Sequence, residues 1–141
     1  MKRSASASWQ GGFKDGRGTI STESGAMNAH PYGYAMRFGD VKGTNPEELI
    51  GAAHAGCFTM ALSAVLGGAG LTAERMDTKA DVTFDKVGEG WEITKIHLTL
   101  KAKVPGTDDA TFQDLAAKAK ANCPVSKVLK AEITLDATLE A

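Results

Sequence analysis

Two cysteines, Cys57 and Cys123, lie in local sequences that can hold a reactive thiolate. Cys57 lies within a long uncharged run behind a strong helix start, whereas Cys123 precedes a proline where one helix ends and another begins. The thiolate is the nucleophilic form of cysteine, and helix N-termini and neighbouring cations lower the pKa of a thiol. A pair of such thiols predicts redox chemistry.

The two positions are not equivalent. A residue before proline is pushed out of the α region, and Pro124 suits the first position of a helix, so Cys123 is predicted to be an N-cap that faces free amides. Cys57 lies in mid-helix, and its own helix offers only His54, three residues earlier, on the same face. On position alone, an inert buried thiol is the more typical interpretation of Cys57, and a structural role for Cys123 has comparable weight.

Composition and charge restrict the class of protein. The chain has 141 residues, of which 43% are hydrophobic, and this predicts a single domain over 1–141. Sixteen Lys and Arg balance seventeen Asp and Glu without a basic stripe, so nucleic acid is not an expected partner. No apolar stretch follows the first two positive charges, so no secretory signal is expected. A cytoplasmic location is predicted, where disulfides are usually transient and catalytic.

Residues 49–66 carry no formal charge, and their number is close to that of a membrane-spanning helix. Small and polar residues interrupt the run and large aliphatic side chains are few, so a buried core helix is the better interpretation and no membrane partner is expected. The helix is predicted over about 46–66, roughly 30 Å long. Because one small domain can hardly enclose such a helix, a second subunit is expected to cover part of it.

The start of this helix is strongly marked. Thr44 or Asn45 can cap it, and each has a Glu three residues later, as in a capping box. Pro46 suits the first helical position, and Glu47 and Glu48 complement the positive end of the helix dipole. Both glutamates are more typical of a helix start than of catalysis.

The remaining elements are mainly predicted β structure, and the fold class is α+β, with antiparallel sheets around the long buried helix. The N-terminal β region, 1–42, contains a hairpin and a strand over 32–38 with Arg37 on its outer face. Such an arginine is usually just solvated. The C-terminal region, 76–141, is predicted as β-β-α-α-β, with a β-bulge between Ile93 and Ile96. Its helices are predicted over 110–122 and 124–130, and its last strand over 133–139.

Other cysteine chemistries are less well supported. A closed zinc site is not expected, because there is no Cys-x-x-Cys or His-x-x-x-His and the histidines lie in unrelated segments. Thioredoxin-type exchange also lacks its Cys-x-x-Cys. A Cys–His hydrolase through His54, oriented by Glu47 or Glu48, is conceivable. However, His54 and Cys57 share one helix and no oxyanion hole is evident.

Three segments together resemble the OsmC/organic hydroperoxide resistance family over essentially the whole chain. They are Gly43–Leu62, Pro31-Tyr32-Gly33-Tyr34 with Arg37-Phe38, and Cys123–Leu135. His54 stands where organic hydroperoxide resistance members typically carry Tyr, which favours the OsmC branch. The resemblance implies a thiol peroxidase that acts as an intertwined homodimer with active sites at the subunit interface.

The same resemblance assigns roles to four residues. Cys57 is implied to be the peroxidatic thiolate and Cys123 the resolving thiol, while Arg37 and Glu47 match the family's activating arginine and its carboxylate partner. The family's other branch takes this arginine from the N-terminal hairpin, where Arg17 is the alternative. The implied reaction reduces organic hydroperoxides and hydrogen peroxide and protects against oxidative stress.

The resemblance implies no bound cofactor and no metal. The disulfide would be reopened by an external dithiol reductant, and a lipoyl-bearing protein is the first candidate. Two other function classes stay open. One is a non-enzymatic OsmC-like module that binds a ligand or protein and whose cysteines are incidental, and the other is a cysteine hydrolase. A sulfenic acid trapped after peroxide treatment would favour the peroxidase over both.

Overall fold

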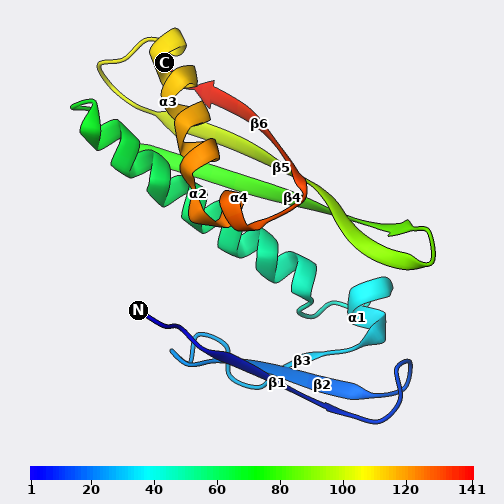
Figure 1. The fold of residues 1–141 in the computed structure, drawn as a ribbon. Coiled ribbons are helices and arrows are strands. Elements are labelled where there is room, and N and C mark those ends of the chain that lie inside the picture. Colours follow the sequence, from blue (N-terminus) through cyan, green and yellow to red (C-terminus); the bar gives the residue numbers. More distant parts are fainter. The chain divides into compact units, whose positions relative to one another are not determined.

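The chain folds into two compact units, residues 1–49 and 50–141, in the computed structural model, which describes all of residues 1–141. Each unit contains one three-stranded sheet (Figure 1). The long helix α2 (Pro46–Gly68) begins in the first unit and contributes most of its length to the second. These sheets and helices confirm the predicted α+β class. The single domain over 1–141 and the intertwined homodimer stay predictions.

The first unit is built on an antiparallel sheet with the strand order β1-β2-β3. Its strands are β1 (Ala5–Gln10), β2 (Arg17–Thr22) and β3 (His30–Tyr32). Gly18 pairs with Trp9 on one side and with Tyr32 on the other, and a Cβ at this position would collide with both rings. The centroids of these two rings lie 5.4 Å apart, so ring contacts hold the sheet together at this point.

Residues 34–38 form the short helix α1 (Tyr34–Phe38), and the predicted strand over 32–38 is wrong. Alternating aromatic residues led to that prediction, but residues four apart also meet on one face of a helix. The ring centroids of Tyr34 and Phe38 lie 4.9 Å apart, and the ring of Phe13 contacts both. Arg37 therefore projects from a helical turn rather than from the outer face of a strand.

The predicted central helix is confirmed as α2, which runs without interruption from Pro46 to Gly68. The side chain of Asn45 accepts a hydrogen bond of 2.8 Å from the backbone N–H of Glu48, which assigns the capping role to Asn45 rather than to Thr44. The helix continues two residues past the predicted end at Leu66 and ends at Gly68.

The second unit contains a sheet with the strand order β4-β5-β6. Its strands are β4 (Arg75–Val87), β5 (Gly90–Lys103) and β6 (Glu132–Leu139). β4 and β5 form an antiparallel hairpin, and their register skips Thr94 opposite the step from Thr83 to Phe84. The β-bulge predicted between Ile93 and Ile96 is therefore confirmed.

β6 pairs with β5 in parallel, which corrects the prediction of purely antiparallel sheets. The chain passes from β5 to β6 through the helices α3 (Asp109–Asn122) and α4 (Pro124–Val128). Such a helical crossover returns the next strand in the same direction as the previous one. Both helices were predicted, but the alternation of side chains along a strand does not reveal the direction of its neighbour.

The core of the second unit lies between one face of the sheet and the helices α2 and α3 (Figure 1). Its larger members are buried apolar side chains from three elements: Phe58, Leu62 and Leu66 of α2, Ile96, Leu98 and Leu100 of β5, and Phe112 and Leu115 of α3. The α2 members recur every four residues, as expected for one face of a helix. This packing fixes the rotation of α2 about its axis.

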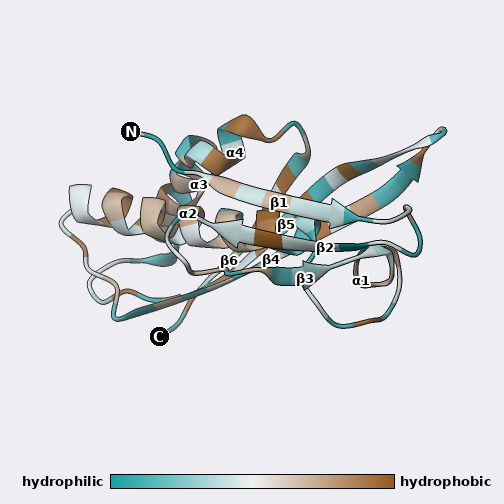
Figure 2. Cartoon of the chain, turned by 90° about the horizontal axis from the view of Figure 1, so that it is seen from below, coloured by the Kyte–Doolittle hydropathy of each residue, from teal (hydrophilic) through white to brown (hydrophobic).

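Only one face of α2 is buried within the chain. Figure 2 draws the helix mostly in white to brown, in keeping with its uncharged sequence. By length and composition alone it could cross a membrane, since its mean hydropathy reaches 1.7, but one such helix is weak evidence and its inner face belongs to the core. Only 28% of that apolar window is buried, so one chain leaves most of the helix uncovered, in keeping with the prediction that one small domain can hardly enclose it. Apart from Glu48 in the first turn, the exposed residues of α2 are small or apolar: Ala52, Ala53, Gly56, Met60, Ser63, Ala64, Gly67 and Gly68.

Candidate active site

The two cysteines singled out in the sequence lie in direct contact. The Sγ atoms of Cys57 and Cys123 are 2.9 Å apart although the residues are sixty-six positions apart in the chain, and both thiols are free. Cys57 is half-buried on α2, and Cys123 is fully buried against the core. The close approach of two free thiols makes this the strongest candidate for a redox centre.

Cys123 joins the end of α3 to the start of α4. Its backbone N–H donates to the carbonyl of Ala119 and so closes α3, while its own carbonyl accepts from the N–H of Lys127 in the first turn of α4. Pro124 occupies the first position of α4, as the sequence predicts, and Cys123 is the N-cap. The free amides at this helix start therefore lie beside the sulfur.

The surroundings shift the two thiols in opposite directions. Burial raises the pKa of the Cys123 thiol, but hydrogen bonds from Cys57 and from the backbone N–H and hydroxyl of Ser126, together with the N–H of Val125, outweigh burial and hold this pKa below its ordinary value. Burial and the hydrogen bond with Cys123 raise the pKa of the Cys57 thiol, and only the N–H of Val125 opposes them. Within the second unit, the hydrogen bonds therefore favour the thiolate form of Cys123 and disfavour that of Cys57.

Arg37 and Glu47 form an ion pair within the first unit. The Nε and Nη2 atoms of Arg37 donate to Oε1 of Glu47 at 3.1 and 2.8 Å, and Nε also lies 3.3 Å from Oε2. Glu47 is buried, whereas the Arg37 side chain is 36% exposed. A carboxylate that accepts hydrogen bonds from two nitrogens of a guanidinium fixes the orientation of that guanidinium in addition to balancing its charge. Arg17, the alternative, is an exposed residue at the start of β2.

The chain matches the family model described as OsmC-like protein over residues 39–138. It is also 58% identical, over 140 residues, to peroxiredoxin OsmC of Escherichia coli (strain K12), which covers 99% of this chain and 98% of that protein. This chain belongs to the OsmC family. The family predicted from the three sequence motifs is thereby confirmed.

More distant relatives of this OsmC-family protein extend the comparison to the other branch. The organic hydroperoxide resistance protein OhrA of Bacillus subtilis (strain 168) is 34% identical over 105 aligned positions, and the match covers 70% of this chain and 67% of OhrA. The crystal structure of the organic hydroperoxide resistance protein OhrB of Bacillus subtilis matches with a TM-score of 0.68 and 25% identity, covering 97% of this chain and 98% of OhrB. An OsmC-like protein from Vibrio cholerae has the same fold, with a TM-score of 0.79 at 18% identity, covering 97% and 99% of the two chains.

His54, which the sequence offered only as a neighbour of Cys57, makes its hydrogen bond elsewhere. Its side chain is fully buried, and its Nε2 atom lies 2.8 Å from the Oγ atom of Ser126 in α4. Burial lowers the pKa of His54, so the ring is neutral near pH 7 and does not supply the cation that was sought for Cys57. Ser126 lies within the Cys123–Leu135 segment, but no sequence pattern predicts its contact with a histidine seventy-two positions away.

The buried His54 predicts that this protein loses stability in mild acid. The unfolded chain binds a proton on His54 near the ordinary pKa of 6.5, whereas the folded chain does so only at lower pH. The stability contribution is therefore complete above pH 6.5 and is lost as the pH falls below it, by at most about 1.4 kcal/mol per pH unit for one proton. Urea unfolding between pH 7.5 and 5 should show this decrease. The decrease in the free energy of unfolding should be smaller in His54→Gln and should persist in His97→Gln, whose half-exposed histidine serves as the control. An equal decrease in the parent and both variants would contradict this prediction.

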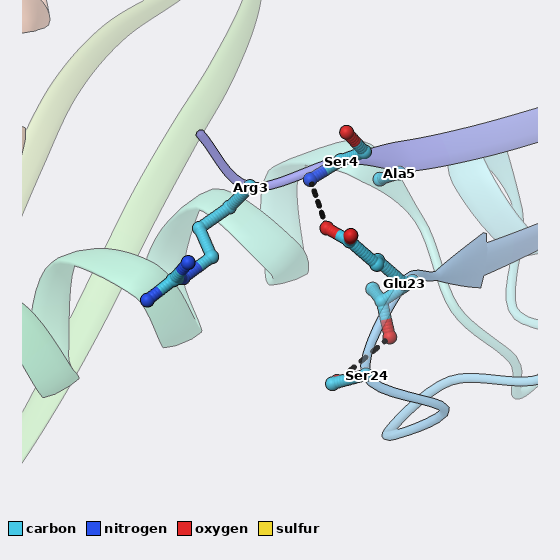
Figure 3. A pocket seen from close by; sticks show the side chains of 6 residues that line it. Arg3, Ser4, Ala5, Glu23 and Ser24 are labelled. Atoms are coloured by element: carbon cyan, nitrogen blue, oxygen red, sulfur yellow. Dashed lines mark hydrogen bonds between the residues drawn. The ribbon is translucent and has the colours of Figure 1, made fainter. Parts of the chain in front are cut away.

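Two surface hollows of the first unit differ in what lines them. One is bordered by the β1 start and the β2 end, where the N–H of Ser4 donates to Glu23 at 3.1 Å (Figure 3). None of the predicted site residues lines it. The other has a volume of about 180 Å³ and is lined by Arg37 and a set of aromatic rings: Trp9, Phe13, Tyr32, Tyr34 and Phe38. Arg3 lines the first hollow, but only the second places a cation, Arg37, beside a cluster of aromatic rings.

Proposed function

We propose that this protein is a thiol-dependent peroxidase that reduces organic hydroperoxides and hydrogen peroxide and so protects against oxidative stress. The contact of 2.9 Å between the two free thiols carries the proposal, because it allows one sulfur to react and the other to recover it. The high identity to a protein named peroxiredoxin OsmC, and the likeness to organic hydroperoxide resistance proteins, support the same reaction.

The proposed cycle assigns a separate step to each thiol. The Cys57 thiolate attacks the terminal oxygen of the hydroperoxide, the O–O bond breaks, and the alkoxide takes a proton and leaves as alcohol, or as water from hydrogen peroxide. Cys57 is thereby oxidised to a sulfenic acid. Cys123 then attacks the sulfenic sulfur, water leaves, and a Cys57–Cys123 disulfide forms. An external dithiol reopens this bond by thiol–disulfide exchange.

Cys57 needs a cation for the first step, because its own surroundings in the second unit raise its pKa. We assign this role to Arg37, whose guanidinium is already oriented by Glu47, in preference to Arg17. The same guanidinium would orient the peroxide oxygens. The aromatic hollow beside Arg37 suits the apolar part of an organic hydroperoxide, so organic substrates should be favoured over hydrogen peroxide.

The proposal includes a homodimer with active sites at the subunit interface. Beyond Glu48 in the first turn, the exposed face of α2 is uncharged and rich in small residues, which allows a second copy of the helix to approach closely. The two thiols reduce the peroxide and an external dithiol regenerates them, so no prosthetic group or metal is required. The reductant is proposed to be a dithiol, with a lipoyl-bearing protein as the first candidate, and the location to be cytoplasmic.

A stoichiometric reaction tests the function directly. Reduced protein mixed with one equivalent of cumene hydroperoxide should release one equivalent of cumyl alcohol and become lighter by two hydrogen atoms. Non-reducing peptide mapping should locate the new bond between Cys57 and Cys123 of one chain, since their sulfurs already touch. Thiol-blocked protein is the control. Alcohol formation without loss of both thiols, or mainly interchain disulfides, would contradict the proposed cycle.

A further inference from the structure

The hydrophobic effect alone does not explain why His54 is buried, because its imidazole ring is polar. It is fully buried, and its Nδ1 is the one buried side-chain nitrogen or oxygen atom for which the structure shows no hydrogen-bond partner. Its other nitrogen is 2.8 Å from the hydroxyl of Ser126. Burying a polar ring with one atom unpaired destabilises the fold. We therefore ask whether the contact of the other nitrogen with Ser126 has a function.

The unpaired nitrogen identifies which atom of the ring carries the proton. In a neutral imidazole one nitrogen is a donor and the other an acceptor. A buried N–H without an acceptor is rarer than a buried acceptor without a donor. By analogy with backbone groups we assign Nδ1 as the bare acceptor and Nε2–H of His54 as the donor to the Oγ atom of Ser126. Because the Ser126 oxygen accepts this bond, its own O–H is available to donate to another group.

The Cys123 sulfur is the candidate acceptor, because the side chain of the third residue of a helix can reach back toward the N-cap residue. Ser126 lies in the first turn of α4, and Cys123 is the N-cap of the same helix. The groups that act on the Cys123 sulfur are Cys57 on α2 and the residues Val125 and Ser126 on α4, and the hydroxyl of Ser126 is among those that favour its thiolate. Ser126 is thus the residue that contacts His54 and also lies at the start of the helix that Cys123 caps.

We propose that His54 is a positioning residue that orients the Ser126 hydroxyl toward Cys123 and thereby prepares the resolving thiol for attack. The proposal rests on the proposed function, because the step that it would accelerate is disulfide formation. His54 and Cys57 lie one turn apart on α2, so a single helix carries both the sulfur to be attacked and the residue that prepares the attacking one.

The chemical step is balanced as follows. The Cys123 thiolate attacks the sulfur of the Cys57 sulfenic acid, an S–S bond forms, and the S–O bond breaks. The leaving hydroxide takes a proton, equivalent to the one that Cys123 gave up on ionisation, and departs as water. The Cys123 sulfur is oxidised by one formal electron and the Cys57 sulfur is reduced by one. Ser126 and His54 keep their own protons throughout and stabilise only the ionised form of Cys123.

The pKa of Cys123 provides a test that does not depend on peroxidase activity. In a Cys57→Ser background, alkylation of Cys123 by iodoacetamide is followed against pH by mass spectrometry. Ser126→Ala should raise the pKa of Cys123 by about one unit, the effect of one hydrogen bond to a charged group. Val128→Ala, at an exposed position of the same helix, is the matched control and should leave the pKa in place. An unchanged pKa in Ser126→Ala would overturn the proposal.

Substitutions of His54 separate a positioning role from simple packing. His54→Leu removes the donor, whereas the amide of His54→Gln can still donate to Ser126. The Leu variant should raise the pKa of Cys123 as Ser126→Ala does, and Gln should restore most of the difference. The double variant His54→Leu/Ser126→Ala should shift the pKa no further than Ser126→Ala alone, since both changes break one chain of contacts. Additive shifts would overturn the proposal.

The pH profile of disulfide formation links this effect to the reaction. After a pulse of hydroperoxide, Ser126→Ala should form the disulfide about threefold more slowly at pH 7, because fewer Cys123 thiols are ionised although each thiolate is more nucleophilic. At a pH above both pKa values only the second effect remains, and the order should reverse. A deficit that is constant with pH would overturn the proposal. Failure of the Cys123→Ser protein to form a sulfenic acid would instead refute the peroxidase function, and the alkylation experiment would still decide the role of His54.

Discussion

Cys57→Ser is expected to abolish peroxide reduction, whereas Cys123→Ser is expected to leave one round of reduction and to block recycling. Serine lacks the thiolate that attacks the peroxide oxygen, so loss of Cys57 removes the first step. Loss of Cys123 removes only the partner that converts the sulfenic acid into a disulfide. Single-turnover measurements with cumene hydroperoxide should show alcohol formation at background in the first variant and one equivalent in the second.

Trapping with dimedone provides the site-specific measurement. The Cys123→Ser protein should carry a dimedone adduct on Cys57 after peroxide treatment, and the Cys57→Ser protein should carry none. The assignment is open to a clear contradiction, because hydrogen bonds within the second unit favour the thiolate of Cys123 rather than that of Cys57. A peroxide-dependent adduct on Cys123 in the Cys57→Ser protein would mean that the two roles are reversed.

The elements that could be predicted from the sequence are those with local signals. Asn45 and Pro46 mark the start of α2, and Pro124 marks the start of α4 with Cys123 as its cap. The bulge in β5 could also be predicted, because the apolar positions Ile93 and Ile96 break the alternation of the strand. In each case the deciding residues are neighbours in the chain.

The predictions were wrong where a local pattern is compatible with two secondary structures, or where segments distant in the chain determine the structure. Tyr34 and Phe38 are four residues apart, a spacing compatible with one face of a strand or of a helix, and the ring of Phe13 supports the helix. The parallel direction of β6 depends on the crossover through α3 and α4, which no pattern within the strand records.

In the candidate site, too, local features could be predicted from the sequence, whereas contacts between distant residues could not. Cys57 and Cys123 could be selected because each has a distinctive local context, but their contact spans sixty-six positions and only the family resemblance implied it. The contact between His54 and Ser126 was not predicted, because a histidine within an apolar helix and a serine in a short helix are ordinary in isolation. Only the tertiary structure brings α4 close enough to α2 for the two side chains to form a hydrogen bond.

Glu47 is expected to act on the thiol of the other subunit, because of the geometry of α2. Glu47 and Cys57 are ten residues apart, which separates them by roughly 15 Å along a continuous helix and by about 80° around it. No break relieves this separation, since α2 is uninterrupted from Pro46 to Gly68. Arg37 is held by Glu47, so it is tied to the same end of the helix. Two copies of α2 packed antiparallel across a two-fold axis would bring Glu47 of one chain near Cys57 of the other.

Mixed dimers distinguish a shared site from one built within a single chain. Glu47→Ala and Cys57→Ser homodimers should both be inactive, the first because Arg37 loses the carboxylate that orients it. In a heterodimer of the two variants, one of the two shared sites would contain Glu47 from the Cys57→Ser chain and Cys57 from the Glu47→Ala chain, and both residues would be intact. Activity should therefore return to about half that of the parent, because one of the two sites in each heterodimer is restored. Glu48→Ala, which alters the next residue on the same helix, is the matched control and should not need complementation. If heterodimers form, as verified by differently tagged chains, and remain inactive, each chain builds its own site and the packing of α2 against a second copy does not assemble it.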